Sequence, residues 1–486
     1  MALASDQFCE GNANYVALAA GIGRVCINPP LDIPNGMWLA QKHVRGEGLD
    51  LDLQATALVL VEGETRVALL DLDLCFLQDQ QAKTIRQLVS EATGIREENV
   101  LPFCTHSHAG PVTQDTYHGE GEDRVQSYIQ SLPHLIASAA TQAAKSVVPV
   151  RVAAGMGHSE IGMNRDLRLP DGRFVVGCNP EGFFDPEVGV IRIDTVQGQP
   201  LACIVNYACH PTVLGWSNKL ISPDYPGSTR RIVEEVTKST CFFLQGAGGN
   251  VGPRETFVGD AAVARRLGTS LGLEAARVYL DLQPVPTERN LRSVVASGAA
   301  LADYEQVPLK VAEPGLGFVH AFLQLPTRTT FAEVYERAPE RLAEWEAKLA
   351  ELKRRNSPKT EIAEALQKVN RERIRISRMD RYRGKKSLPV ESFVIRLGEI
   401  AIVAISGEPY SEIGAQVKAR SPFPGKTLFG GYLGGYMPYI PTADVYAFQP
   451  PPMEVDNSPY APQAAQIAID HLAALFSGSQ MKGTPN

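Results

Sequence analysis

The sequence has no long apolar run and no excess of positive charge. No segment of the 486 residues reaches the ~18 consecutive apolar residues that a membrane-spanning helix needs. The formal net charge is −7 and the isoelectric point is near 5.8, which argues against nucleic acid as the main partner. The N-terminus lacks a basic stretch followed by an apolar core, so no secretory signal is predicted and a cytoplasmic location is expected.

Paired cysteines are also missing. The eight cysteines are spread along the chain and none forms a Cys-x-x-Cys motif. Most lie in apolar runs, where a free cysteine behaves as a small hydrophobic residue. We therefore expect mostly reduced thiols that serve in packing. Internal repeats and low-complexity tracts are absent, and the apolar content of 44% suits a globular protein with a large core.

A pair of histidines stands one residue apart at the end of an apolar run. Val100–Cys104 precedes Thr105-His106-Ser107-His108, and Ala109-Gly110-Pro111 follows as a turn. On an extended strand, residues two apart point to the same face, so His106 and His108 are expected side by side at a strand end. Neutral imidazole is a common metal ligand, and the pair predicts one side of a zinc site. A hydrogen-bonded core histidine is the alternative.

Two further apolar runs end in a possible metal ligand. His210 follows the run Leu201–Tyr207 and precedes Pro211, while the run Ile400–Ile405 leads into Gly407-Glu408-Pro409. A carboxylate at the end of a buried strand needs a partner, because burying it alone is costly. Two histidines and one glutamate leave a coordination position open, which is typical of catalytic rather than structural zinc.

The order of strand-like and helix-like segments predicts an α/β fold with a mixed β-sheet core and flanking helices. Strands are expected over 55–61, 66–74, 98–104, 188–194, 201–207 and 240–245, and helices over 81–93, 125–146 and 260–282. Residues 331–384 are rich in Glu, Arg, Lys, Ala and Leu, and Pro358 interrupts them. They predict a helical hairpin at the surface. Of two interpretations, a solvent-exposed insertion with no part in the site is preferred over a hairpin that covers the pocket. Residues 477–486 are expected to form a flexible tail.

These segments resemble, in order and approximate spacing, the N-terminal catalytic domain of neutral/alkaline (non-lysosomal) ceramidases. The stretch Thr105–Pro111 is close to the family's Thr-His-Thr-His-Ser-Gly-Pro, and the other similar stretches are Gly21–Pro30, Met163–Arg165, Cys209–Thr212, Ser222–Gly227, Gly249–Pro253, Ser406–Pro409 and Tyr436–Tyr439. The resemblance implies a catalytic domain over 21–476, after an N-terminal extension at 1–20 and with a helical insertion at 331–384. It also implies a zinc amidase that cleaves an N-acyl bond.

The resemblance implies four zinc ligands, namely His106, His210, Glu408 and a tyrosine of the C-terminal region. Tyr439 is the preferred tyrosine, and Tyr436 and Tyr446 are the alternatives in the same loop.

Three further residues are expected to take part in the reaction. His108 and Arg165 match family positions that contact the reacting group. We expect Arg165 and Tyr436 to stabilise the oxyanion, and His108 to carry a proton to the leaving amine. An ordinary ion pair for Arg165, a packed ring for the tyrosine and a bracing role for His108 are the structural alternatives.

One stretch departs from the family. Where the family has Gly-Asp-Val-Ser-Pro-Asn, this chain has Gly249-Asn250-Val251-Gly252-Pro253-Arg254. The family serine has been considered as a nucleophile, and Gly252 cannot act as one. Metal-activated water is therefore the simpler mechanism for this chain. The glycine-rich run also lacks the Gly-Lys-Ser/Thr ending of a phosphate-binding loop, and we interpret it as a close backbone approach that lines the pocket.

The sequence thus predicts a zinc-dependent hydrolase of amide bonds, acting on a small N-acyl compound that is more soluble than ceramide. A zinc esterase or lactonase is the first alternative, because carbonyl activation by zinc does not distinguish an amine from an alkoxide leaving group. A non-catalytic binding protein of the same fold is the second. The identity of the substrate and the oligomeric state stay open.

Overall fold

The largest sheet contains strands that are buried along almost their whole length. β3 (Gln54–Glu62) and β4 (Thr65–Leu72) are buried on both faces, as expected for strands covered from two sides. The sheet has eight strands in the order β12-β10-β9-β6-β1-β3-β4-β5. The other strands are β1 (Ala19–Cys26), β5 (Val100–Cys104), β6 (Val148–His158), β9 (Glu187–Thr195), β10 (Pro200–Tyr207) and β12 (Thr240–Gln245). The pairs β4–β5 and β10–β12 are parallel and the others antiparallel, so the sheet is mixed.

A second sheet packs on one face of the first. It has four strands in the order β16-β17-β18-β20, namely β16 (Leu316–Pro326), β17 (Ser387–Leu397), β18 (Ile400–Ile405) and β20 (Thr427–Gly430). Alternate residues of the facing strands form one buried cluster, which includes Leu58, Phe103, Phe393 and Ile402. The antiparallel pair β17–β18 begins at the tight turn Gly398–Glu399, where Gly398 has a φ of 61°.

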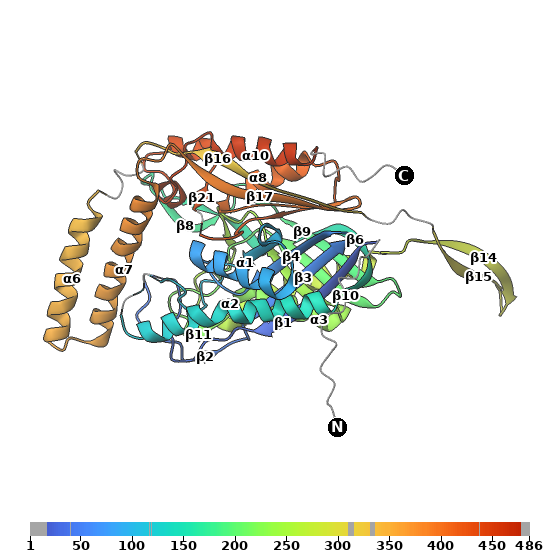
Figure 1. Ribbon diagram of the computed structural model, residues 1–486, viewed down its shortest axis with the longest axis horizontal. Coiled ribbons are helices and arrows are strands. Elements are labelled where there is room, and N and C mark those ends of the chain that lie inside the picture. Colours follow the sequence, from blue (N-terminus) through green and yellow to red (C-terminus); the bar gives the residue numbers. More distant parts are fainter. Residues whose placement is uncertain are drawn as a thin grey trace, which may run out of the picture.

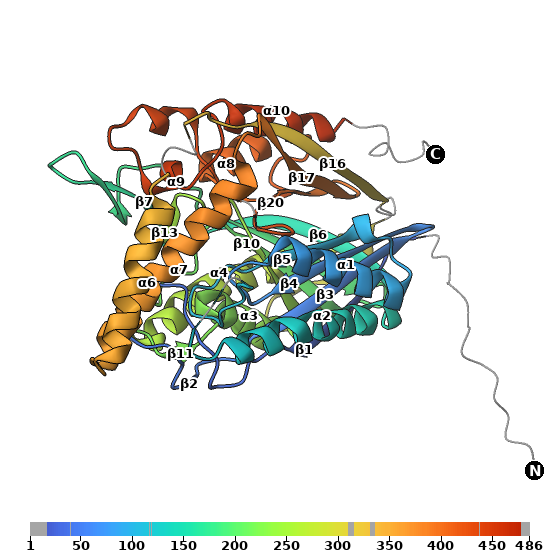
Figure 2. The same ribbon diagram turned by 60° about the vertical axis from the view of Figure 1, so that its left-hand side comes forward.

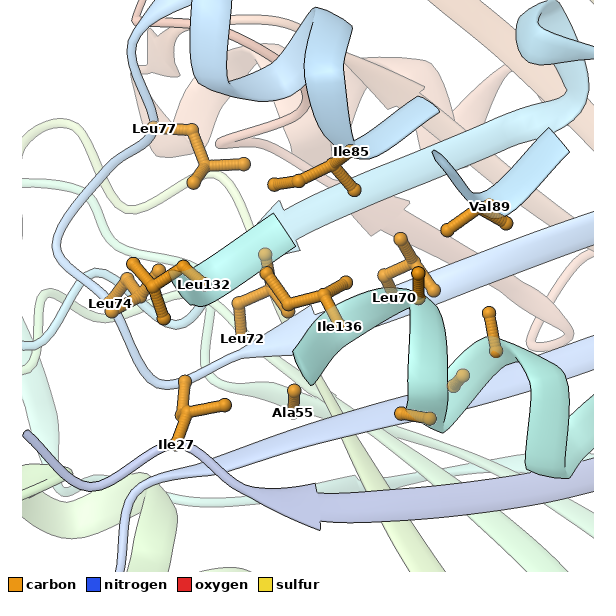
Figure 3. Packing of buried hydrophobic residues seen from close by; sticks show 14 of the residues in the cluster. Ile27, Ala55, Leu70, Leu72, Leu74, Leu77, Ile85, Val89, Leu132 and Ile136 are labelled. Atoms are coloured by element: carbon orange, nitrogen blue, oxygen red, sulfur yellow. The ribbon is translucent and has the colours of Figure 1, made fainter. Parts of the chain in front are cut away.

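Helices cover the outer face of each sheet. α1 (Asp79–Thr93) and α2 (Glu122–Lys145) pack on β1, β3 and β4, where Ile85, Leu132 and Ile136 meet Leu70 and Leu72 (Figure 3). α3 (Asp224–Thr237) and α4 (Ala261–Asp281) cover β9, β10 and β12 on the same face. α8 (Ser411–Ala419) and α10 (Ala464–Leu475) lie on the second sheet. The stack is therefore helices, sheet, sheet, helices (Figure 1).

Shorter elements surround this stack. They are the sheets β11 (Leu220–Ile221) with β2 (Gly48–Leu49), β13 (Val251–Pro253) with β7 (Gly162–Arg168) and β8 (Phe174–Asn179), β14 (Thr287–Ala296) with β15 (Ala300–Pro308), and β19 (Glu408–Pro409) with β21 (Tyr439–Ile440), together with α9 (Met453–Asp456) and the 3₁₀ turns Glu97–Asn99 and Ala443–Ala447. The β14–β15 hairpin extends from one end of the molecule (Figure 1).

Two helices stand at the opposite end. α6 (Ala338–Arg354) and α7 (Lys359–Tyr382) pack against each other through a small apolar cluster and run alongside the stacked layers (Figures 1 and 2). The helical hairpin predicted within 331–384 is thus present.

The structure describes residues 17–477 apart from residues 39, 116, 118, 310–314, 331–335 and 437 and the side chains of 378 and 379. The tail predicted over 477–486 and most of the extension over 1–20 lie outside these residues. Within them, no helix combines the length and the apolar character needed to cross a bilayer. The predicted α/β class is confirmed, and the predicted strands and helices agree with β3, β4, β5, β9, β10, β12, α1, α2 and α4.

Candidate metal centre

Two loops that leave the first sheet at distant positions meet beside β12. The strand order separates β5 from β10, but β12 contacts β3, β4 and β5, so the two ends of the order approach each other. The backbone N–H of Phe243 on β12 donates to Asp71 Oδ2 on β4 at 2.9 Å. His106 follows β5 and His210 follows β10, and this closure brings the two loops together.

The side chains of His106, His210 and Glu408 converge on one point. Glu408 Oε2 lies 3.1 Å from His210 Nε2 and 3.5 Å from His106 Nε2. The three ligand atoms lie within 4.8 Å of one another, and all three residues are buried. His106 has a φ of 71° and Gly407, just before the glutamate, a φ of 112°. A non-glycine residue in this region stores strain, which is common where function fixes a side chain.

The second ring nitrogen of each histidine faces a main-chain carbonyl. His106 Nδ1 lies 2.6 Å from Cys75 O, and His210 Nδ1 lies 2.5 Å from Gly248 O. A carbonyl oxygen only accepts hydrogen bonds, so Nδ1 carries the proton and Nε2 turns its lone pair to the centre. This is the arrangement that a metal-binding histidine requires.

Electrostatics agree with this protonation state. Burial lowers the pKa of both imidazoles, that of His210 to about 3, and keeps them neutral. Burial opposes ionisation of Glu408, but the neighbouring His106 and His210 outweigh it and lower the pKa of the carboxyl to about 2. Two neutral imidazoles and one carboxylate form a donor set that fits a divalent metal such as zinc.

Arg165 and Tyr439 lie beside this donor set, as predicted. Tyr439 begins β21, which pairs in parallel with β19 so that Tyr439 is opposite Glu408. Its ring stacks on that of His210 with centroids 6.3 Å apart. Arg165 Nη2 donates to Tyr439 Oη at 3.2 Å and pairs with Glu454 Oε1 at 2.7 Å. The guanidinium is therefore fixed next to the centre by a buried carboxylate.

His108 also reaches the centre, though not along a strand. β5 ends at Cys104, and the left-handed backbone of His106 breaks the extended conformation, so the expectation of a strand carrying both histidines is wrong. The rings are nevertheless adjacent, with Nε2 of His108 3.3 Å from Nε2 of His106. Trp38 packs on the other side of His108 at 5.0 Å between ring centroids. Nδ1 of His108 has no hydrogen-bond partner within the described part of the chain.

A cavity of about 770 Å³ opens onto the centre. His106, His108, Glu408 and Tyr439 line it, and so does Tyr436, the third predicted catalytic residue. The ring of Tyr436 lies 5.0 Å from that of Phe76. Tyr446, by contrast, donates through its hydroxyl to Tyr460 O at 3.0 Å and is not among the residues that line the cavity.

Tyr432 also lies at the centre, which the sequence did not predict. Its ring lies 4.5 Å from that of His106, and its hydroxyl is 3.4 Å from His210 Nδ1. The residue is buried and has a φ of 57°. The one local signal that could have identified it is an aromatic residue inside the run Gly430–Gly435, directly after an apolar strand.

A second omission, Glu454, carries no comparable signal. It lies on the short α9, far from Arg165 in sequence, and only the fold brings the two side chains together.

The glycine-rich stretch makes the close backbone approach that the sequence predicts, beside the candidate ligand Glu408, but its residues are not among those that line the cavity. A Cβ on Gly249 would come within 2.5 Å of Glu408 O, so only glycine allows this approach of two backbones. Asn250 Nδ2 donates to Glu412 Oε2 at 2.9 Å, and Asn250 Oδ1 accepts from Ser411 N at 2.8 Å. A Cβ on Gly252 would meet Arg165 Cβ at 3.6 Å, an ordinary contact.

Buried groups also lie next to the candidate ligands in the chain. Asp73, directly after β4, is fully buried, accepts from Thr105 Oγ1 at 3.2 Å and pairs with Arg230. Cys104 and Cys209 are buried free thiols. Within the described residues, neither belongs to a potential metal-binding group.

Three further aromatic residues, Trp216, Phe183 and Phe184, are not among the residues that line the cavity. Trp216 packs edge-on against Trp38, which contacts His108, and it is 43% exposed. Phe184 instead packs against the core under β9 and β10, and the side chain of Phe183 is exposed.

The helices α6 and α7 contribute directly to the cavity. Arg341 of α6 and six residues of α7 are among its lining residues, and Tyr382 ends that series. The preference for a solvated excursion is therefore wrong, because α7 forms a wall of the cavity that holds the candidate metal centre.

Comparison with known proteins gives a consistent picture. Residues 19–251 match the family model for neutral/alkaline non-lysosomal ceramidase, N-terminal. Neutral ceramidase A of Dictyostelium discoideum is 29% identical over 242 residues, which are 46% of this chain and 33% of that protein. Neutral ceramidase B of the same organism is 28% identical over 196 residues, which are 37% of this chain and 27% of that protein. The aligned part of the chain spans about a third of the length of these relatives.

Solved structures extend the likeness to the whole fold. The neutral ceramidase of Pseudomonas aeruginosa superposes with a TM-score of 0.65 at 18% identity, covering 96% of this chain and 75% of that one. A ceramidase complexed with C2 gives a TM-score of 0.66 at 18% identity, covering 95% and 75%. At this identity the likeness concerns the fold. Residues 19–251 thus match the neutral/alkaline non-lysosomal ceramidase family, and the chain as a whole shares the fold of solved neutral ceramidases.

Proposed function

We propose that this chain is a zinc-dependent hydrolase that cleaves amide bonds of N-acyl compounds. The observation that carries the proposal is the convergence of His106 Nε2, His210 Nε2 and Glu408 Oε2 at the end of the cavity, with both Nδ1 atoms held by carbonyls. Tyr439 is the fourth proposed ligand, from its position opposite Glu408. Family relatives named as ceramidases support an amide substrate.

The metal would supply carbonyl polarisation and a water molecule of lowered pKa. His106, His210 and Glu408 would hold the metal at the end of the cavity. Arg165 and Tyr436 would stabilise the negative charge that develops on the carbonyl oxygen, and Arg165 is held in place by Glu454 and Tyr439. Nε2 of His108 takes a proton from the attacking water and returns it to the leaving nitrogen. Gly252 leaves no side-chain hydroxyl at the position of the family serine, which favours water as the nucleophile.

An esterase or lactonase at the same site is the second candidate, because the geometry places the same groups around any acyl carbon. A matched amide and ester with one acyl group separate these functions by their kcat/KM values. A binding protein that holds zinc without hydrolysing either substrate is the third candidate.

Elemental analysis of the purified protein tests the metal site. Wild type should contain about one zinc per chain, and His106→Ala and His210→Ala should each lose most of it. His134→Ala is the matched control, because His134 lies exposed on α2. A folded wild-type protein that takes up no zinc when zinc is supplied would contradict the hydrolase mechanism.

A further inference from the structure

The part of the cavity wall formed by α6 and α7 is rich in arginine. Four guanidinium groups line the same cavity as His106 and Glu408, one from α6 and three from α7, and they are Arg341, Arg371, Arg375 and Arg381. Among the described residues, Asp456 and Glu408 are the acidic residues that line the cavity. When Glu408 binds a divalent cation, the charge that remains on the lining is positive.

Helical spacing explains why α7 presents this face. Arg371, Ile374 and Arg375 are three or four residues apart, and Arg381 and Tyr382 continue the same face two turns later. The opposite face carries Ala365, Leu366 and Val369, which pack on Leu349 and Leu352 of α6. The apolar contact with α6 therefore fixes α7 with its arginines toward the cavity.

Nearby carboxylates orient three of these arginines. Arg341 Nε and Arg375 Nη1 share a single carboxylate, at 3.0 Å from Glu372 Oε2 and 2.5 Å from Glu372 Oε1. Arg381 pairs with Asp79 at the start of α1. Each guanidinium has five N–H donors in a planar fork, so a guanidinium that gives one to Glu372 still offers others to a ligand.

The cavity also has the size of a small-molecule site. Its volume of about 770 Å³ falls within the range of ligand pockets, and Met37, Phe76 and Met453 add apolar surface to its lining. A molecule with its acyl carbon at the metal ligands would place its other end toward α7.

We propose that Arg371, Arg375 and Arg341 bind an anionic group of the substrate, so that the substrate is a small N-acyl compound carrying a carboxylate or a phosphate on its amine side. This inference rests on the proposed function for the reacting bond, but it concerns a different part of the cavity. Planar guanidinium groups recognise both anions by paired hydrogen bonds.

The test uses three substrates that share one scissile bond. They are N-hexanoylglycine, N-hexanoylphosphoethanolamine and the neutral N-hexanoylglycinamide, and hexanoate release is measured with the zinc-loaded full chain. Wild type should hydrolyse at least one anionic substrate with a kcat/KM about tenfold or more above that of the neutral one. The preference should fall with rising salt, because exposed charges are screened. The anion that is preferred identifies the group.

The variants separate recognition from a structural role. Arg371→Gln/Arg375→Gln should raise KM for the anionic substrate about tenfold at nearly constant kcat and leave the neutral substrate within about twofold. Arg375→Lys should retain part of the preference. Arg373→Gln is the matched control, because Arg373 pairs with Glu346 of α6 at 2.8 Å and does not line the cavity.

The outcomes also distinguish this inference from the proposed function. If wild type prefers the neutral substrate, or if the double variant lowers activity on all three equally, the anion site is refuted. If zinc-loaded wild type hydrolyses none of them, the proposed function fails, and calorimetric binding of the same three compounds decides the anion site. Tighter binding of an anion than of N-hexanoylglycinamide, lost in the double variant, would still support it, and equal binding would overturn it.

Discussion

At the residue scale, the departure from the family at Asn250 has a structural reason. Its amide donates to Glu412 and accepts from the backbone N–H of Ser411, at the start of α8. Burial raises the pKa of the Glu412 carboxyl, and the hydrogen bond from Asn250 partly offsets that effect. An aspartate in place of Asn250 would bring two buried carboxylates together. The amide at 250 therefore suits its partner, whatever its effect on catalysis.

Asn250→Asp should lower the free energy of unfolding by about 1–3 kcal/mol at pH 8, because it replaces a donor by a like charge. The loss should shrink as the pH falls toward 5, since one proton shared by the two carboxyls removes the repulsion. Urea unfolding measured at both pH values checks this. Adding Glu412→Gln should restore most of the stability at pH 8. An Asn250→Asp variant as stable as wild type at pH 8 would contradict the explanation.

The residues of the centre that the sequence identified share one property. His106, His210 and Glu408 each end an apolar run, so local patterning places them at strand ends where side chains reach a loop-lined site. Tyr432 has only a weak signal within its glycine-rich loop, and Glu454 has none. Their proximity to the centre depends on contacts between segments distant in the chain, which periodicity does not encode.

At the element scale, one ion pair links the two sheets. Arg86 of α1, on the first sheet, donates to both oxygens of Glu391 on β17 at 2.7 and 2.8 Å, and His320 of β16 contacts the same carboxylate at 2.9 Å. Glu391 is buried. Burial opposes its ionisation, but the hydrogen bond from His320 and the charge of Arg86 outweigh it and lower the pKa of this carboxyl. The group therefore stabilises the fold in its ionised form.

Glu391→Gln should cost about 3 kcal/mol at pH 7, because the change leaves the charge of Arg86 without its counter-charge. A carboxyl with a lowered pKa adds stability above its unfolded pKa and loses it as the pH falls through the folded value. Wild type and variant should therefore converge in stability below about pH 4. Chemical unfolding across pH measures this. Glu399→Gln, which breaks an exposed pair with Lys426, should leave the unfolding midpoint unchanged.

The elements differ in how far the sequence predicts them. The apolar runs of β3, β4, β10 and β12 and the helical periodicity of α1, α2 and α4 are local signals, and these elements lie where expected. Strand pairing is not local. That β12 contacts β5, and that β18 packs on the first sheet, depend on loop closure across hundreds of residues. The role of α7 was predicted wrongly for the same reason. Its charged face has the pattern of a solvent-exposed helix, and only the tertiary structure shows that this face lines the cavity.

At the scale of the whole molecule, the candidate ligands come from both sheets. His106 and His210 follow strands of the first sheet, and Glu408 follows β18 of the second. A metal held by all three would cross-link the two layers at the end of the cavity. Local opening of either layer would then require loss of the metal, so binding and folding are coupled.

Zinc should therefore raise the stability of the entire described fold. At a free zinc concentration of a hundred times Kd, a ligand that binds only the native state adds about 2.7 kcal/mol to the free energy of unfolding. Calorimetric scans with zinc and with a chelator should show a single transition that moves to lower temperature when zinc is removed. His106→Ala should unfold at one temperature in both conditions, while His134→Ala should respond as wild type does. A transition in wild type that ignores zinc, although elemental analysis finds the metal bound, would mean that the metal does not join the two layers through His106, His210 and Glu408.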